Sequence, residues 1–248
     1  MRFCATYSDS HKPFLDKFFF KSFPFEFGTS LVLERMPQKC SNNGWIFADG
    51  WRDQMIEKQK FINKHLNSTP DPTIVFCDVD INFYGNLHDD IQACLENYDI
   101  AFMKDHNSDR SGRCGGFFVV KNGDKIKKLF ATVLSKLQSF SKEEKTSFNT
   151  SEQQTINSVL DSMPEIKWTF LPPRYYTHGL YKEGVKDFSE TAQRGLWWES
   201  KDEEEKENVF IPHDIKVHHA NWASGVQRKL ELLEFINNKV KDRSKHDK

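Results

Sequence analysis

The sequence predicts an α/β protein built on a central, mostly parallel sheet flanked by helices. Strand and helix patterns alternate along residues 1–140, which is typical of parallel strands joined by helices. One apolar segment, TIVFC at 73–77, runs directly into the acidic pair Asp78 and Asp80. Because ligands bind at the carboxyl ends of strands in such sheets, this pair marks the expected site.

The predicted elements follow from hydrophobic periodicity and from turn residues. Apolar or alternating segments predict strands at 2–7, 25–34, 73–77, 99–105, 114–120, 167–170 and 215–222. Apolar residues at helical spacing predict helices at 12–23, 50–67, 87–98, 124–137, 151–163 and 225–240. Ser151 is the expected N-cap of its helix, because serine accepts a hydrogen bond from a first-turn N–H group.

Size and composition allow one large domain, or two small ones with an extended interface. The chain has 248 residues, 38% of them hydrophobic, and its 22 phenylalanines predict an aromatic-rich core. We expect a single domain over 1–240, a charged loop at 199–208 and a charged, frayed tail at 241–248. The formal net charge of −1 argues against general affinity for nucleic acid or anionic membranes.

Cysteine usage and hydropathy predict a cytoplasmic protein. The 5 cysteines show no metal-like spacing, and Cys4 and Cys77 lie inside predicted strands, which is typical of reduced thiols. The N-terminal stretch has no apolar core of a signal peptide. No segment approaches the roughly 20 apolar residues that a membrane span requires.

Asp78 and Asp80 predict a cation site. Side chains at i and i+2 of an extended segment point the same way, so both carboxylates should face one site. Like charges that close repel each other, and a divalent cation would offset the repulsion. The alternative is a strand-to-turn cap, in which the carboxylates accept hydrogen bonds from the turn.

Four segments, in this order, resemble the nucleotide-sugar glycosyltransferases of the GT-A fold. The resemblance is to the branch of lipo-oligosaccharide galactosyltransferases and glycogenin-like enzymes, and it covers about residues 1–235. The segments are IVFCDVDINFYGNL, GRCGGFFVVKNGDKIKKL, SEQQTIN and VHHANWASGVQRK. The resemblance implies a Rossmann-like sandwich with a nucleotide-binding half at 1–110 and a donor-sugar and acceptor half at 111–240.

The resemblance also implies a Mn²⁺ or Mg²⁺ ion. In that family the second aspartate of the DxD motif and a late histidine bind the metal, which makes Asp80 and His219 expected ligands and Asp78 a further one. Such an ion neutralises the charge of a departing nucleoside diphosphate. His218 and His219 are adjacent and point to opposite sides of an extended segment, so only one can serve; the family pattern favours His219.

The resemblance implies nucleotide contacts in two segments of the predicted nucleotide-binding half. The loop after the first strand holds the base and ribose in the family, which makes Thr6, Tyr7 and Asp9 expected contacts. Arg52 and Lys60, on the helix at 50–67, resemble the basic residue that reaches the nucleotide. The alternative for both is an ordinary surface charge on a helix.

The diphosphate and the sugar have their own implied contacts. Lys229 or its neighbour Arg228 resembles the diphosphate-binding lysine, at a longer spacing from the histidine than in the family. Val79, within the DxD motif, and Gly116, beneath the donor sugar, complete the cofactor contacts. The tripeptide CGG at 114–116 stands where the family has NAG.

Gln153 and Glu152 are the implied catalytic pair. Gln153 resembles the residue beside the reacting carbon, and Glu152 the acid that binds sugar hydroxyls. The alternative is a helix N-terminus whose acidic residues complement the helix dipole. The resemblance thus implies a metal-dependent hexosyltransferase that moves a sugar from a UDP-sugar to a glycan or other hydroxyl acceptor, and it favours retention. The alternative is inversion, which needs a carboxylate base on the far side of the sugar; Glu152, Asp105 and Asp109 are the candidates.

Two other functions fit the same motif. A phosphohydrolase of the haloacid-dehalogenase type also carries DxD after an apolar strand and would use Asp78 as nucleophile. That fold has the motif on its first strand, whereas two strands precede it here. A non-catalytic sugar-binding protein on the same fold is the third interpretation, because fold alone does not establish activity.

Overall fold

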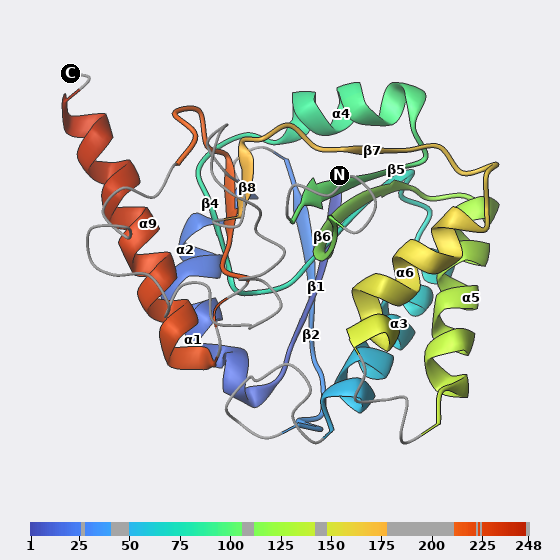
Figure 1. Cartoon of the computed structure of the whole chain (residues 1–248). Coiled ribbons are helices and arrows are strands. Elements are labelled where there is room, and N and C mark those ends of the chain that lie inside the picture. Colours follow the sequence, from blue (N-terminus) through green and yellow to red (C-terminus); the bar gives the residue numbers. More distant parts are fainter. Residues whose placement is uncertain are drawn as a thin grey trace.

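The computed structural model describes residues 1–25, 28–40, 50–105, 112–141, 148–177, 211–221, 223 and 225–246. These residues form two sheets with helices on both sides (Figure 1). The main sheet has 6 strands in the order β2-β1-β3-β6-β5-β7. Its strands are β1 (Arg2–Tyr7), β2 (Ser30–Arg35), β3 (Thr73–Cys77), β5 (Ile100–Lys104), β6 (Arg113–Lys121) and β7 (Trp168–Phe170).

The main sheet is mostly parallel, as the sequence predicts. β1 runs parallel to both β2 and β3, and β7 runs parallel to β5, while β6 is antiparallel to its two neighbours. β3 is buried on both faces: Ile74 and Phe76 pack on one side, Val75 and Cys77 on the other. A strand covered on both faces requires a continuous apolar run, which explains the TIVFC segment.

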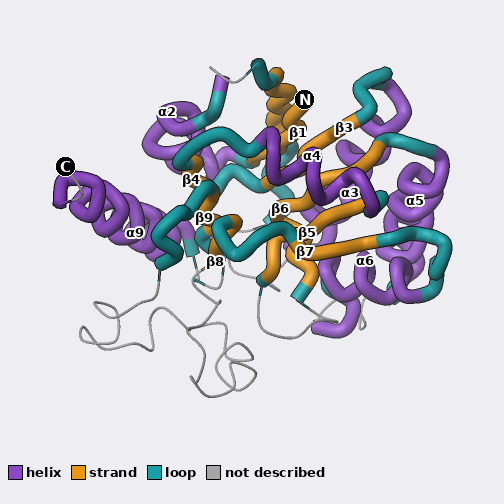
Figure 2. The backbone as a smooth tube through the Cα atoms, turned by 90° about the horizontal axis from the view of Figure 1, so that it is seen from above, coloured by secondary structure: helices purple, strands orange, loops and turns teal. Residues whose placement is uncertain are grey.

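Three helices cover one face of the main sheet (Figures 1 and 2). They are α3 (Trp51–Ser68), α5 (Asp124–Ser139) and α6 (Glu152–Asp161), with α5 in contact with both others. Ser151 caps α6 as predicted, because its Oγ accepts a hydrogen bond from the N–H of Gln154 at 3.4 Å. The capped end of α6 lies near the carboxyl end of β3, where Glu152 and Lys58 of α3 meet.

A second, smaller sheet and further helices cover the opposite face (Figure 1). The small sheet has the order β4-β9-β8 and consists of β4 (Ile81–Phe83), β9 (Val217–His219) and β8 (Tyr175–Thr177). Its neighbours are α4 (His88–Asn97), α9 (Val226–His246) and the short helical segments α1 (Lys12–Phe14), η2 (Leu15–Phe19) and α2 (Phe20–Ser22). In the described part of the chain, no helix has the length and apolar character that a membrane crossing demands.

Three predicted boundaries are wrong, and β4 and β8 lie outside every predicted strand. The strand expected at 215–222 is limited to β9. The strand expected at 25–34 begins only at Ser30, because Gly28 has φ 68°, in the left-handed region that interrupts an extended strand. The helix expected to end at residue 240 continues to His246, so most of the predicted frayed tail is helical. Arg243 holds this last part by donating to the carbonyl of Ile211 at 2.8 Å. The predicted charged loop at 199–208 lies outside the described residues.

Candidate functional site

Strand pairing brings two distant segments together at the carboxyl end of β3. β4 begins just after the DxD motif and pairs with β9, so that Ile81 lies opposite His219. The N–H of Ala220 then donates to the carbonyl of Asp80 at 2.9 Å. These backbone contacts place the late histidine beside the aspartates, although well over a hundred positions of sequence separate them.

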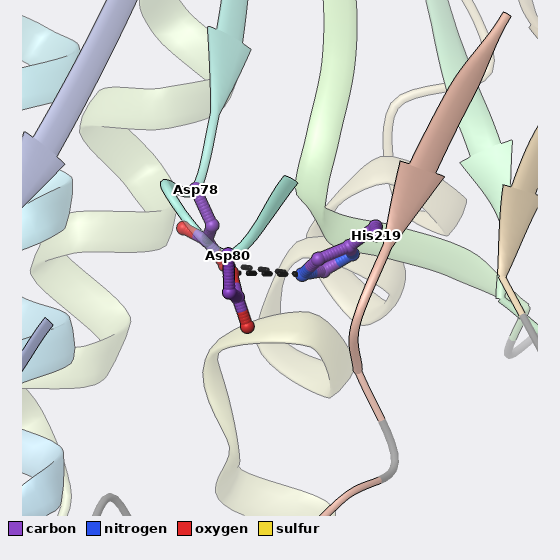
Figure 3. A group of neighbouring side chains, drawn as sticks. All are labelled: Asp78, Asp80 and His219. Atoms are coloured by element: carbon purple, nitrogen blue, oxygen red, sulfur yellow. Dashed lines mark ion pairs between the residues drawn. The ribbon is translucent and has the colours of Figure 1, made fainter. Parts of the chain in front are cut away.

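Asp78, Asp80 and His219 form a cluster of candidate metal ligands, which we call the DDH cluster (Figure 3). One ligand atom from each residue lies within 4.8 Å of the others. The His219 Nε2 atom is 3.3 Å from Asp80 Oδ1 and 3.9 Å from Asp78 Oδ2. Val79, between the aspartates, is buried in the core, and the chain bends at 79–80 so that both carboxylates face the cluster.

A lysine from α9 completes the charge balance around Asp80. The Lys229 Nζ atom lies 2.6 Å from Asp80 Oδ2. Burial opposes ionisation of Asp80, but Lys229 and His219 outweigh it and hold the pKa of Asp80 well below its usual range. Burial also opposes the charged form of His219, but the Asp80 carboxylate overcomes this and raises the pKa of His219 to about 10. The cluster therefore strongly favours a cation beside Asp80.

A second buried lysine lies on the other side of the cluster. The Lys58 Nζ atom is 2.7 Å from Asp78 Oδ1, 3.2 Å from Glu152 Oε2 and 3.0 Å from the carbonyl of Gly115. Gln59 donates to the other oxygen of Glu152 at 2.6 Å. Burial raises the pKa of Glu152, although the nearby ammonium opposes that change. Burial disfavours the charged form of Lys58, but the two carboxylates more than compensate and raise its pKa.

The DDH cluster fits a divalent cation such as Mn²⁺ or Mg²⁺. Two carboxylates and one imidazole form a ligand set that suits these ions. In the structure Lys58, His219 and Lys229 lie against these carboxylates and supply positive charge to them. The space beside the ligands is kept open by Gly116, where a Cβ atom would lie 2.7 Å from Asp78 Oδ2 and would collide with the His219 ring.

Replacing Gly116 with alanine is therefore expected to weaken Mn²⁺ binding by more than about tenfold, because the methyl group would displace two of the three ligands. Gly123→Ala is the matched control, since a Cβ atom at Gly123 meets no atom within 4 Å. Isothermal calorimetry with Mn²⁺ measures both variants. Equal Mn²⁺ affinity of Gly116→Ala and the wild type would contradict the assigned ligand positions.

Gln153 is held in one orientation next to the DDH cluster. Its Nε2 donates to Asp105 Oδ2 at 2.9 Å, and its Oε1 accepts from the N–H of Gly115 at 3.2 Å. Because a carboxylate only accepts and an N–H only donates, the two contacts agree on which way the amide points. Asn221, just after β9, donates to the other oxygen of Asp105.

The structure separates the two adjacent histidines. His219 points to the aspartates, whereas His218 is fully buried with its ring 5.6 Å from that of Tyr176. Burial lowers the pKa of His218 to about 3, so this ring is neutral near pH 7. His219 is thus the histidine of the pair that lies at the cluster.

The predicted base and ribose contacts lie at the end of β1. Thr6 is buried and Tyr7 is half-buried, and both belong to the strand itself. Asp9 accepts two hydrogen bonds of 2.7 Å from the guanidinium of Arg35, at the end of the neighbouring strand β2. Hydrogen bonds from Arg35 lower the pKa of Asp9. These side chains remain predicted nucleotide contacts.

The two basic residues predicted on α3 have different surroundings. Lys60 points outward and pairs with Glu57 at 2.8 Å, with its side chain half exposed, so the structure places it away from the DDH cluster. Arg52 is buried, donates to Thr150 Oγ1 at 2.6 Å and lies over the ring of Phe140. Arg52 therefore connects α3 to the segments that border α5 and α6.

Sequence reasoning missed Lys58 and the contact of Cys114 with His219, whereas Asp105 was already a candidate carboxylate base. A signal for Lys58 was present, because it shares a helix face with Phe61 and Ile62 and a lysine on an apolar face requires partners. For Asp105 the signal was its position directly after β5. Cys114 carried no signal beyond its place in the CGG tripeptide.

Comparisons with known proteins agree with this site. The sequence profile of the nucleotide-diphospho-sugar transferase family matches residues 53–233, a range that contains the whole DDH cluster. A search of curated proteins found no significant match.

Solved structures share the fold. One is a glycosyltransferase involved in the glycosylation of the major capsid of PBCV-1, with a TM-score of 0.51, 10% identity, and coverage of 71% of this chain and 83% of that chain. Another is the apo form of the glycosyltransferase GlyE of Streptococcus pneumoniae TIGR4, with a TM-score of 0.50 and 12% identity. That match covers 94% of this chain but 59% of GlyE.

The family match and the shared fold support a glycosyltransferase rather than a phosphohydrolase or a non-catalytic sugar-binding protein. They agree with an α/β fold in which the aspartate motif follows a central strand. The chain therefore belongs to the nucleotide-diphospho-sugar transferase family and is a glycosyltransferase with a GT-A-like fold.

Proposed function

We propose that the protein transfers a sugar from a UDP-sugar to a glycan or other hydroxyl acceptor, and that it requires Mn²⁺ or Mg²⁺. The observation that carries the proposal is the DDH cluster at the carboxyl end of β3, flanked by the ammonium groups of Lys58 and Lys229. Asp78, Asp80 and His219 would hold the ion. When bound, the ion supplies a Lewis acid for the diphosphate oxygens.

Lys229 is suited to the departing diphosphate. Its side chain is 18% exposed and reaches the cluster from the start of α9, so its ammonium can turn from Asp80 toward a phosphate. A lysine ammonium is a point charge with several donors, which suits a leaving group whose negative charge grows during bond cleavage. Gly116, which lies directly against Asp78 and His219, allows the backbone to approach these ligands closely.

Glu152 and Gln153 would hold the donor sugar, and the arrangement supports retention. An inverting reaction requires a free carboxylate base on the far side of the sugar. Among the described residues, Glu152 is bound by Lys58, and Asp105, another nearby carboxylate, is 2% exposed and bound by Gln153; Asp109 lies outside them. In a retaining reaction the leaving phosphate oxygen takes the acceptor proton on the same face. The anomeric configuration of the product, read by NMR, decides between the two outcomes.

Calorimetry of UDP binding with and without Mn²⁺ tests the proposal. The wild type should bind UDP only with Mn²⁺ present, and Asp80→Asn should lose this binding because the amide offers a weaker, neutral ligand. Asp89→Asn on the exposed side of α4 is the matched control and should bind like the wild type.

Absence of both UDP and GDP binding in the presence of metal would refute the donor site. If UDP binds, a panel of UDP-sugars assayed for slow hydrolysis identifies the donor. If UDP binds equally well with and without Mn²⁺, the proposed nucleotide site stands and the proposed metal requirement is refuted.

A further inference from the structure

The ligand histidine has a second ring nitrogen, and it faces a cysteine. The His219 Nδ1 atom lies 3.6 Å from the sulfur of Cys114, on the side of the ring opposite the aspartates. Both residues are buried, His219 at 3% and Cys114 at 2% exposure. Elsewhere in the described residues, no side chain hydrogen-bonds to this nitrogen.

The sulfur acts as an acceptor at this position. The N–H of Gly116 donates to the Cys114 sulfur at 3.3 Å, within the longer range that sulfur allows. A sulfur that accepts from one side can also accept from an N–H of the imidazole.

The identity of the protonated nitrogen decides whether His219 can bind a cation. A neutral imidazole carries its proton on one nitrogen and offers a lone pair on the other. A cation that takes the place of the Nε2 proton, 3.3 Å from Asp80, binds the Nε2 lone pair while the proton on Nδ1 is donated to Cys114. Metal-bound histidines usually have such a hydrogen bond on the outer nitrogen, most often to a carboxylate, a carbonyl or water.

Backbone pairing alone does not orient this ring. The register of β4 and β9 positions the His219 backbone, but the side chain can still rotate about its own bonds. Cys114 projects from β6, a strand of the other sheet, and so restrains the ring from a separate element. The Asp80 and Cys114 contacts together hold both edges of the ring.

We propose that Cys114 is a positioning residue that holds His219 in the tautomer and orientation required to bind the divalent cation. The inference rests on the proposed metal-dependent function and adds to it a residue that does not contact the ion. It also gives a role to the CGG tripeptide, in which the thiol supports the histidine and the second glycine leaves space for it.

Calorimetry with Mn²⁺ alone tests the proposal on Cys114→Ala and Cys114→Ser. The alanine variant should bind Mn²⁺ about tenfold more weakly, because the outer nitrogen loses its partner. The serine variant should stay within about threefold of the wild type, because a hydroxyl also accepts a hydrogen bond. Cys94→Ala, a half-buried thiol on α4 outside the cluster, should bind Mn²⁺ like the wild type.

Thermal unfolding in EDTA distinguishes a purely structural role of the Cys114 thiol from an effect on Mn²⁺ binding. A lower melting temperature of Cys114→Ala with unchanged Mn²⁺ affinity would overturn the proposal. A loss of affinity that serine restores supports it. If the wild type itself does not bind Mn²⁺, the proposed metal dependence and this inference both fail, whereas equal binding by the wild type and Cys114→Ala rejects the inference alone.

A spectroscopic measurement on the wild type covers the case in which the variants do not fold. Long-range ¹H–¹⁵N correlation of the histidine rings, recorded with saturating Mg²⁺, reports which nitrogen of His219 carries the proton. The proposal requires the proton on Nδ1. A proton on Nε2 of His219 under these conditions overturns it.

Discussion

Replacing Lys58 with methionine is expected to lower the free energy of unfolding by about 3 kcal/mol. The ammonium of Lys58 is buried between Asp78 and Glu152, and its removal leaves Glu152 without its charged partner in the interior. We take the lower end of the usual cost of breaking a buried ion pair, because the Asp78 side chain is 34% exposed and water screens it. Urea unfolding without metal at pH 7 measures the effect.

Two further variants make the Lys58 prediction specific. Lys60→Met, on the outer face of the same helix, should change stability by less than about 0.5 kcal/mol, because its pair with Glu57 is exposed. Adding Glu152→Gln to Lys58→Met should recover part of the loss, since both buried charges are then removed. A cost of Lys58→Met no larger than that of Lys60→Met would contradict the buried ion pair.

Replacing Phe118 with alanine is expected to lower the free energy of unfolding by about 3–5 kcal/mol. Phe118 lies in the middle of β6 and is fully buried. Its ring is stacked on Phe130 of α5, with centroids 5.1 Å apart, and lies 5.4 Å from Phe76 and 5.8 Å from Phe102. Truncation would leave a cavity between the sheet and α5 that this rigid aromatic cluster cannot close.

The matched control for Phe118 is the same substitution at an exposed position. Phe20 is 43% exposed, and Phe20→Ala should cost less than about 1 kcal/mol. Phe118→Leu, which keeps most of the volume, should cost less than about 1.5 kcal/mol. Urea unfolding of the three variants checks the order. Equal costs for Phe118→Ala and Phe20→Ala would show that the aromatic cluster is not a tightly packed core.

The sequence by itself determined most of the local elements and, within the DDH cluster, the two aspartates. Hydrophobic periodicity predicts β3 and the helices because side-chain direction repeats with the backbone geometry of a single element. The same rule predicts that Asp78 and Asp80 face one site, and both carboxylates do face the DDH cluster, although the chain bends at 79–80. Ser151 is recognised as a cap because capping depends on a few neighbouring residues.

The family resemblance predicted site residues that hydrophobic periodicity could not predict. It selected His219 from an adjacent pair, and the structure places this histidine, rather than His218, beside the aspartates. It also pointed to Lys229, which lies 2.6 Å from Asp80. These residues are too distant in sequence for any local pattern to associate them with the DxD motif.

Only the tertiary structure decided which side chains from different elements meet. Lys58 rather than Lys60 reaches the cluster because the rotation of α3 against the sheet turns one helix face inward and the other to solvent. Cys114 meets His219 because the register of β4 with β9 and the position of β6 coincide at that point. Such contacts depend on long-range strand register and helix rotation, which the packing of the whole core determines and no single segment of sequence encodes.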